Sequence, residues 1–132
     1  MLLVDTNVLV DVLQNDPRWA DWSIAQMRAQ ASLHVLVINP IIYAEISLSF
    51  STLEALDDVV ATLALELREI PRPALFLAAK AYAQYRRRGG NKLQVLPDFF
   101  IGAHAAFEGW PLLTRDASRF RTDFPTLDIV AP

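Results

Sequence analysis

The chain has no cysteine among its 132 residues, which excludes disulfide scaffolds, thiolate metal sites and cysteine nucleophiles. His34 and His104 are its two histidines, so a bound metal ion would be held mainly by oxygen ligands. Long hydrophobic runs are missing as well, because Asp5 and Asp11 interrupt the apolar N-terminal stretch and no basic region precedes it. Neither a signal peptide nor a membrane span fits this pattern, and we expect a cytoplasmic protein with no membrane partner.

Core-forming residues, by contrast, are abundant. Hydrophobic residues make up 53% of the chain and charged residues 20%, which is typical of a compact globular protein and not of a disordered one. A chain of this length can build one hydrophobic core but not two. We therefore predict a single domain that spans residues 1–132.

The net charge of −3 hides an asymmetry between the two halves of the chain. Residues 1–66 hold nine acidic and two basic residues, a net charge of −7, whereas residues 67–132 hold ten basic and six acidic residues, a net charge of +4. Arginines cluster at residues 86–88 and around Asp116, where they would attract a phosphate-rich substrate. The alternative for residues 86–88 is that they complete the last turn of a helix, where cations suit the helix dipole.

Short apolar runs alternate with helical patterns along the chain. We expect strands at residues 2–4, 34–38, 112–114 and 127–130, with residues 67–70 as a short strand or an extended link. Helices are expected at residues 7–13, 17–30, 40–50, 52–64, 73–88 and 97–108, and a mobile loop at residues 91–96. Without any hairpin signal, this order predicts an α/β fold with a parallel β-sheet of four to five strands flanked by helices in three layers.

Capping signals mark where four of these helices begin. Side-chain oxygens of Asp, Asn, Ser and Thr satisfy free backbone N–H groups at helix starts, and proline is tolerated in the first turn. The predicted caps are Asp5 or Thr6, Asp16 before Pro17, Asn39 before Pro40, and Ser51 in a capping box with Glu54.

Four acidic residues stand where a strand ends or within the first turns of a helix, namely Asp5, Glu45, Asp98 and Asp116. Asp5 and Asp116 each follow an expected buried strand, and Asp98 falls in the first turn of a helix, where the dipole favours an anion. Open parallel sheets bind ligands in the crevice outside the carboxyl ends of their strands. We therefore expect these four carboxylates to converge at that edge.

The segments that carry these acids resemble a known family. They read LVDTNVL at residues 3–9, NPIIYAE at 39–45, LPDFFIGAHA at 96–105 and LTRD at 113–116. This ordered set resembles the PIN-domain ribonucleases, and in particular the VapC toxins of bacterial toxin–antitoxin pairs. The resemblance runs from Leu2 to about Pro125, and all four acidic positions of the family pattern are filled. It implies a PIN-like fold, metal-dependent cleavage of RNA and inhibition by a small VapB-like antitoxin.

The chemistry of clustered carboxylates is consistent with that resemblance. Neighbouring carboxylates repel each other, and such a cluster persists when a cation or protons neutralise it. Oxygen ligands select hard ions, so Mg²⁺ or Mn²⁺ is the expected occupant. Our hypothesis is that Asp5, Asp98 and Asp116 hold the ion or its waters, while Glu45 orients or deprotonates the water that attacks a phosphodiester.

Polar residues next to these acids form a second group of candidates. Thr6, Asn7 and Thr114 could fix the carboxylate rotamers or bind phosphate, and helix capping is the alternative for them. Arg115 adjoins the acids and could contact the RNA strand, or it could point outward with no effect on activity. For His104 we expect a structural or surface role.

The apolar density of residues 41–50 predicts a surface that needs a partner. A second copy of the chain or a partner segment would cover it, and the family resemblance points to both a homodimer and a bound antitoxin.

Two other functions are compatible with parts of the pattern. An aspartate-nucleophile phosphatase also carries an acid after its first strand, but that chemistry usually needs a second acid two positions later, where this chain has Asn7. A catalytically silent PIN-like binding module would keep the fold, although it would have no use for four intact acids.

Overall fold

The computed structural model describes residues 1–92 and 95–132, and five parallel strands form its central sheet. The strand order is β3-β2-β1-β4-β5, so the first strand is central and the chain crosses over it between β3 and β4. This confirms the predicted α/β class. The strands are β1 (Leu2–Val4), β2 (Leu36–Ile38), β3 (Glu66–Leu67), β4 (Leu112–Leu113) and β5 (Ile129–Val130).

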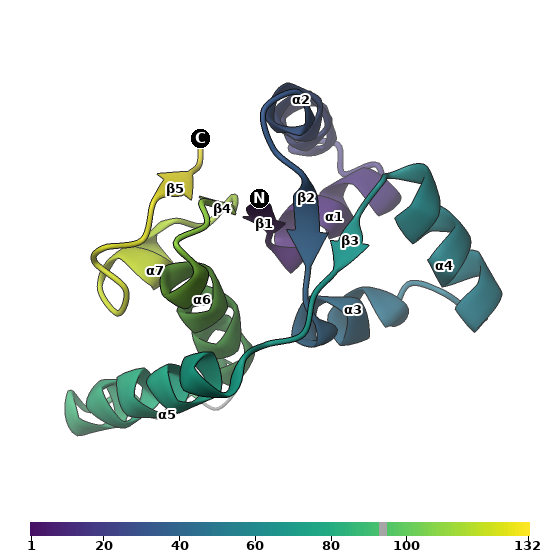
Figure 1. Ribbon diagram of the computed structural model, residues 1–132. Helices are drawn as coiled ribbons and strands as arrows, with labels where there is room; N and C mark the ends of the chain where they lie inside the picture. The colour runs from purple at the N-terminus through teal and green to yellow at the C-terminus, as the bar shows by residue number, and fades with distance from the viewer. Residues whose placement is uncertain (93–94) are drawn as a thin grey trace.

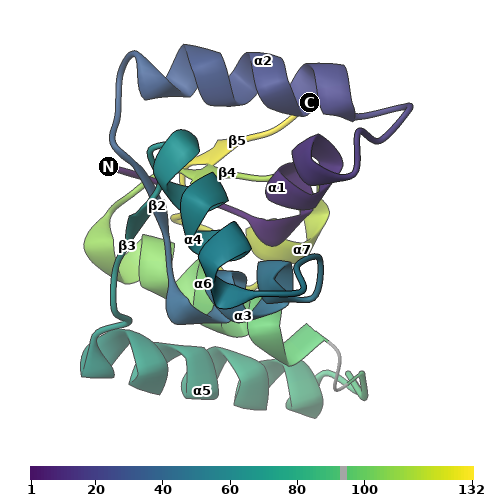
Figure 2. The same cartoon turned by 90° about the vertical axis from the view of Figure 1, so that its right-hand side faces the viewer.

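Helices cover both faces of this sheet (Figure 1). On one side lie α1 (Thr6–Leu13), α2 (Ala20–Ala31) and α4 (Leu53–Thr62); on the other lie α5 (Arg72–Arg87), α6 (Leu96–Glu108) and α7 (Ser118–Arg121). The helix α3 (Pro40–Ser47) follows the end of β2 and packs against both α1 and α6. Figure 2 shows α2 and α5 at opposite ends of the molecule, with the sheet between them.

The central strands form the core because both of their faces are covered by helices. Leu2, Leu3 and Val4 of β1 are fully buried, as are Leu112 and Leu113 of β4. Continuous apolar runs are typical of parallel strands with no solvent-facing side. The register pairs Leu3 with Leu112 and Val4 with Leu113. The residues that follow β1 and β4 therefore emerge side by side at the same edge.

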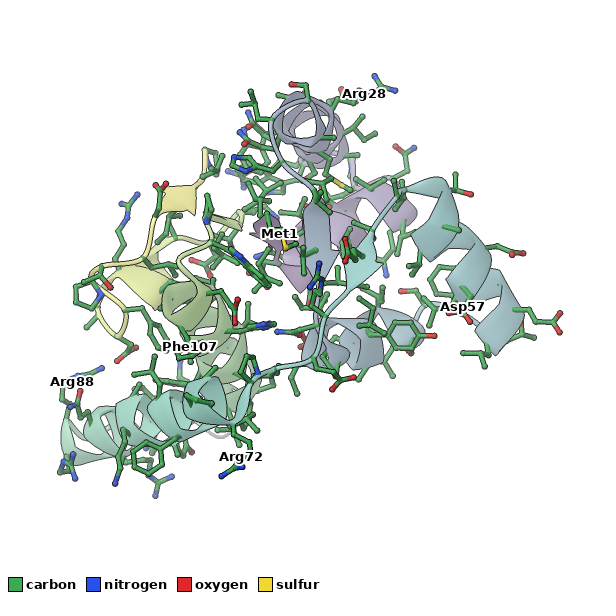
Figure 3. All side chains as sticks on the ribbon, in the orientation of Figure 1. Met1, Arg28, Asp57, Arg72, Arg88 and Phe107 are labelled. Atoms are coloured by element: carbon green, nitrogen blue, oxygen red, sulfur yellow. The ribbon has the colours of Figure 1, made fainter. Side chains whose placement is uncertain are left out.

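Charge follows the layers of the fold. The acidic half of the chain builds α1 to α4, and the basic half builds α5 to α7. Figure 3 shows Asp57 on α4 far from Arg72 and Arg88 on α5. Among the helices of the basic half the positive residues lie on α5 and α7, whereas the charged residues of α6 are the acids Asp98 and Glu108.

Several predicted boundaries are wrong: α3 ends at Ser47 and not at residue 50, and β5 begins at Ile129 and not at residue 127. Three further differences each have a local reason. The second helix begins at Ala20 and not at Pro17, because Asp16 accepts hydrogen bonds from the N–H groups of residues 18 and 19 and forms a turn there. The strand β2 begins at Leu36 and not at residue 34, because the N–H of His34 still bonds to the last turn of α2. The cap of α4 is Thr52, whose hydroxyl accepts from the N–H of residue 55, and not Ser51.

The remaining caps are confirmed. Asp5 and not Thr6 caps α1, and Asn39 caps α3 by accepting a 3.0 Å hydrogen bond from the N–H of Ile42. Residues 67–70, left open between strand and link, contribute Leu67 to β3. The loop predicted at residues 91–96 includes residues 93–94, which lie outside the described residues, and its last residue already belongs to α6.

The position of α6 depends on a glycine in its middle. A Cβ at Gly102 would lie 2.5 Å from a ring carbon of Phe124 and 3.1 Å from one of Phe120. Any larger residue would push these rings away, so Gly102 lets the segment after β4 pack directly on α6. This close packing places Asp98 near the residues that follow β4.

His104 is buried on α6, as a structural role requires. Its Nδ1 lies 3.2 Å from the side-chain amide of Asn39, and its ring lies 5.1 Å from that of Trp110. The predicted structural role is consistent with these contacts, and burial lowers the pKa of His104 to about 4. The histidine therefore joins α6 to the end of β2 in its neutral form.

His104 should make the protein less stable in mild acid. Its pKa is 6.5 in the unfolded reference and about 4 in the folded protein, so the unfolded chain binds more protons between these values. The free energy of unfolding should fall by about 2 to 3 kcal/mol from this group as the pH drops from 6.5 to 4. Urea denaturation of the parent and of His104→Gln at several pH values checks this. An equal pH dependence of the two proteins would contradict it.

No helix in the described part of the chain combines the length and the apolar character needed to cross a membrane.

Candidate active site

Asp5 lies at the centre of the candidate site, directly after β1. Its side chain is 5% exposed, and its two oxygens accept 2.8 Å hydrogen bonds from the N–H of Thr6 and from the hydroxyl of Thr114. The pKa of Asp5 is raised to about 7, mainly by burial and also by the negative charges of Asp98 and Glu45, while the two hydrogen bonds oppose the shift. The surroundings of Asp5 therefore disfavour its ionised form, and near neutral pH its negative charge is energetically costly.

Glu45 and Asp98 reach the same region because α3 packs against α6. Burial raises the pKa of Asp98, and the charges of Glu45 and Asp116 raise it further, while Arg119 lowers it. Each of the four acids thus acts on at least one other through its charge. The structure brings the four predicted acids to one edge of the sheet, from four separate segments of the chain.

Thr6 positions Glu45. Its hydroxyl donates a 2.6 Å hydrogen bond to Oε1 of Glu45, 39 residues further along the chain. The capping alternative for Thr6 is wrong, because Asp5 is the cap of α1. The contact fixes the rotamer of Glu45 across the space between α1 and α3.

Thr114 connects three parts of the site. Its buried hydroxyl donates to Asp5 and accepts from the N–H of Asp116 at 3.1 Å and from the side-chain amide of Asn7 at 3.4 Å. Asn7 in turn accepts a 3.2 Å hydrogen bond from the N–H of Arg115. Both residues therefore hold the segment after β4 against the start of α1, in support of the neighbouring carboxylates.

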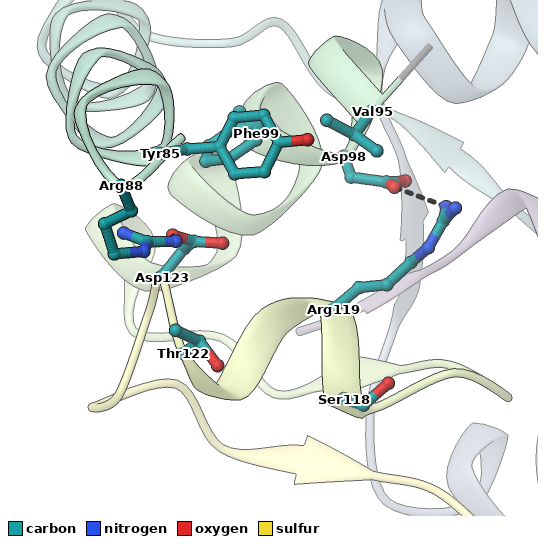
Figure 4. A pocket seen from close by; sticks show the side chains of 9 residues that line it. All are labelled: Tyr85, Arg88, Val95, Asp98, Phe99, Ser118, Arg119, Thr122 and Asp123. Atoms are coloured by element: carbon teal, nitrogen blue, oxygen red, sulfur yellow. Dashed lines mark hydrogen bonds and ion pairs between the residues drawn. The ribbon is translucent and has the colours of Figure 1, made fainter. Parts of the chain in front are cut away.

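Asp116 and Asp98 share one cation from the chain itself, the guanidinium of Arg119. Its Nη1 lies 2.6 Å from Oδ2 of Asp98, and its Nε lies 3.3 Å from Oδ2 of Asp116. Figure 4 shows the contact with Asp98 at the edge of a cavity of about 210 Å³. Ser118 also donates a 3.0 Å hydrogen bond to Oδ1 of Asp116.

Arg115 turns away from the four acids and toward α1. Its guanidinium donates to both oxygens of Asp11, at 2.9 and 3.0 Å, and lies 5.5 Å from the centre of the Trp19 ring. Asp11 is 2% exposed and also accepts from the hydroxyl of Ser23 at 2.9 Å. These contacts give Arg115 a structural role, and its predicted contact with substrate stays a prediction.

Sequence reasoning missed Asp11, Ser118 and Arg119 as members of the site and its support. For Asp11 a signal was present, since an acid among the apolar residues of a short helix needs a buried partner. For Arg119 the spacing of three residues from Asp116 was also visible in the sequence. Nothing in the sequence indicates that the same arginine also reaches Asp98.

The donor chemistry of the site fits a hard divalent ion. Its candidate ligands are all carboxylate oxygens, which Mg²⁺ and Mn²⁺ prefer, and Arg119 already supplies a positive charge between two of them. In residues 1–92 and 95–132, however, no three carboxylate or imidazole groups stand close enough together to hold one ion as they are. Binding an ion would therefore require a rearrangement of these side chains.

The comparisons with known proteins agree with this architecture. The PIN domain model matches residues 2–125. The fold resembles that of a chain in VapBC2 from Rickettsia felis bound to a promoter DNA fragment (TM-score 0.75, 18% identity, 98% of this chain and 97% of the other). It also resembles DNA-bound VapBC from Salmonella typhimurium (TM-score 0.72, 22% identity, 99% and 98%) and VapBC-1 from nontypeable Haemophilus influenzae (TM-score 0.74, 17% identity, 98% and 96%).

No curated protein matches the chain significantly. The family model nevertheless covers nearly its whole length, including the segments that carry all four acids. The chain belongs to the PIN domain family.

Proposed function

We propose that the protein is a metal-dependent endoribonuclease that acts as the toxin of a type II toxin–antitoxin system. The observation that carries this proposal is the charge coupling among the acids at the carboxyl edge of the sheet: Asp5 is buried with its pKa raised by burial and by Asp98 and Glu45, and the charges of Glu45 and Asp116 raise the pKa of Asp98. Burial and nearby negative charges destabilise a carboxylate that serves only the fold, whereas a bound cation would neutralise these charges.

In this proposal Asp5, Asp98 and Asp116 hold Mg²⁺ or Mn²⁺. The ion would supply activation of water and stabilisation of charge on the phosphoryl group. Glu45 would orient the attacking water, and the hydrogen bond from Thr6 keeps its carboxylate in place. The hydroxyl of Thr114 would keep Asp5 and Asp116 in fixed positions relative to each other, because it donates to Asp5 and accepts from the N–H of Asp116. The basic residues of α5 and α7 would attract the RNA backbone.

The partners follow from the proposed class. Three structural neighbours are VapBC proteins, which supports a VapB-like antitoxin as the partner of this chain. Ile42 and Ile46 of the apolar segment are buried within the fold, and Leu48 is 91% exposed. Phe76 on α5 is also 65% exposed, and such apolar surface is available to an antitoxin or to the second copy of a homodimer. A toxin that acts on cellular RNA would work in the cytoplasm.

Cleavage of total bacterial RNA tests the proposal. Purified protein is incubated with Mg²⁺, with Mn²⁺ or with EDTA, and the RNA is resolved on a gel. We expect discrete fragments, including fragments from transfer RNA if that is the substrate, in both metals and none in EDTA. A control variant, Asp21→Asn, removes an exposed acid on α2 and should cleave RNA like the parent.

Two outcomes would overturn the proposal. Metal binding by a folded protein that cuts no RNA would favour a silent PIN-like binding module. Hydrolysis of a small phosphate monoester without cleavage of RNA would favour an aspartate-nucleophile phosphatase.

A further inference from the structure

Arg119 occupies the position of a bridging cation in the acid site. It joins Asp98 on α6 to Asp116 after β4, at 2.6 and 3.3 Å, and these are two of the three carboxylates proposed to hold the metal ion. The oxygen Oδ2 of each acid is engaged by the same guanidinium. An ion coordinated through these same two oxygens would need lone pairs that Arg119 now uses.

We propose that Arg119 is a built-in competitor of the divalent ion, which neutralises Asp98 and Asp116 in the metal-free protein and must leave them when the ion binds. This inference rests on the proposed metal-dependent function. It assigns to Arg119 a role opposite to that of a ligand-positioning residue, because its removal should strengthen metal binding.

The arginine is placed so that its side chain can leave while its backbone stays. Its side chain is 49% exposed, whereas the next residue, Phe120, is 1% exposed and anchors α7 in the core. Arg119 lines a cavity of about 210 Å³, which offers space for its side chain (Figure 4). Asp123 also lines that cavity, where it is already paired with Arg88 at 2.7 Å.

The energetic balance favours displacement. An exposed ion pair between one guanidinium and a carboxylate contributes little to stability, because solvent screens it and two long side chains lose freedom. A divalent ion carries twice the charge and can be coordinated directly by carboxylate oxygens. Arg119 should therefore weaken the affinity for the ion without preventing its binding.

Calorimetric titration of metal-stripped protein with Mn²⁺ tests the inference without any substrate. We expect Arg119→Gln to bind Mn²⁺ with a dissociation constant roughly three- to tenfold lower than that of Arg121→Gln. Arg121→Gln is the matched control, because it removes the same charge from the same helix at an exposed position. Arg119→Lys, which keeps the charge but loses the fork that spans both acids, should fall between the parent and Arg119→Gln.

Thermal unfolding gives a second readout. Metal-free Arg119→Gln should melt below metal-free Arg121→Gln, and saturating Mn²⁺ should raise its melting temperature by more. An affinity of Arg119→Gln equal to that of the control, or weaker, would overturn the inference and leave the proposed function intact. If the parent and all variants are folded but bind no Mn²⁺, the metal-dependent function fails together with the inference.

Discussion

Replacing Asp5 by asparagine is expected to lower RNA cleavage by at least roughly a hundredfold at saturating metal. Asp5 is buried beside the other acids, and burial together with the charges of Asp98 and Glu45 raises its pKa. Asparagine keeps the size of the side chain and an oxygen that can accept from the N–H of Thr6, but it removes the negative charge. Cleavage rates of parent and variant across a series of Mn²⁺ concentrations measure this loss.

The same substitution should stabilise the metal-free protein at neutral and alkaline pH. Asp5 has a pKa of 3.8 in the reference state and about 7 when folded, so the folded protein binds more protons between these values. Stability from this group is fully present below pH 3.8 and is lost as the pH rises through 7. Asparagine avoids this loss, and we expect metal-free Asp5→Asn to gain about 1 to 3 kcal/mol at pH 8 and nothing at pH 4.

Denaturation in urea with EDTA, at pH 4 and pH 8, measures that difference. The combination of lower activity with higher stability separates an acid that serves function from one that supports the fold. Cleavage at the parental rate would show that Asp5 is not part of the reaction. A variant that is less stable than the parent at pH 8 would show that its hydrogen bonds outweigh the cost of its charge.

Loss of Asp11 is expected to have the largest effect on stability. The side chain is 2% exposed, binds both sides of the Arg115 fork and accepts from the hydroxyl of Ser23. Asp11→Ala leaves the guanidinium, 31% exposed, without its carboxylate and leaves the serine hydroxyl in the core. Breaking a buried ion pair on one side is costly, and we expect a loss of about 2 to 4 kcal/mol.

A double-mutant cycle with Arg115→Gln tests whether this loss comes from the ion pair. The double variant should be more stable than the sum of the two single losses predicts, by about 1 kcal/mol or more. Asp21→Asn again serves as the control at an exposed position of α2. Strict additivity, or a loss for Asp11→Ala no larger than that of the control, would show that the pair is not important for folding.

The pair also bears on activity, because Arg115 stands between Thr114 and Asp116. Its N–H bonds to Asn7 while its guanidinium bonds to Asp11, so two contacts hold this segment to α1. Arg115, which was predicted to contact substrate, thus supports the position of Asp116, the neighbouring candidate for metal binding. The sequence could not reveal this, because Asp11 is 104 residues away along the chain.

Local patterns were sufficient for the architecture of this protein. Apolar runs, helix periodicity and the caps at Asp5 and Asn39 predicted the alternation of strands and helices, and the absence of hairpin signals predicted a parallel sheet. These features depend on neighbouring residues, so a single sequence contains them. The errors at Ala20, Leu36 and Thr52 lie at element ends, where hydrogen bonds of the preceding turn compete with the next element.

The sequence by itself determined the α/β class and the placement of four acids at strand ends and helix starts, because periodicity and caps act over a few residues. Tertiary structure alone decided that Thr6 holds Glu45, that Arg115 pairs with Asp11 and that Arg119 joins Asp98 to Asp116. Most of these contacts join side chains that are 20 to 110 residues apart. Which side chains meet at those separations depends on how helices pack over the sheet, and no local pattern encodes it.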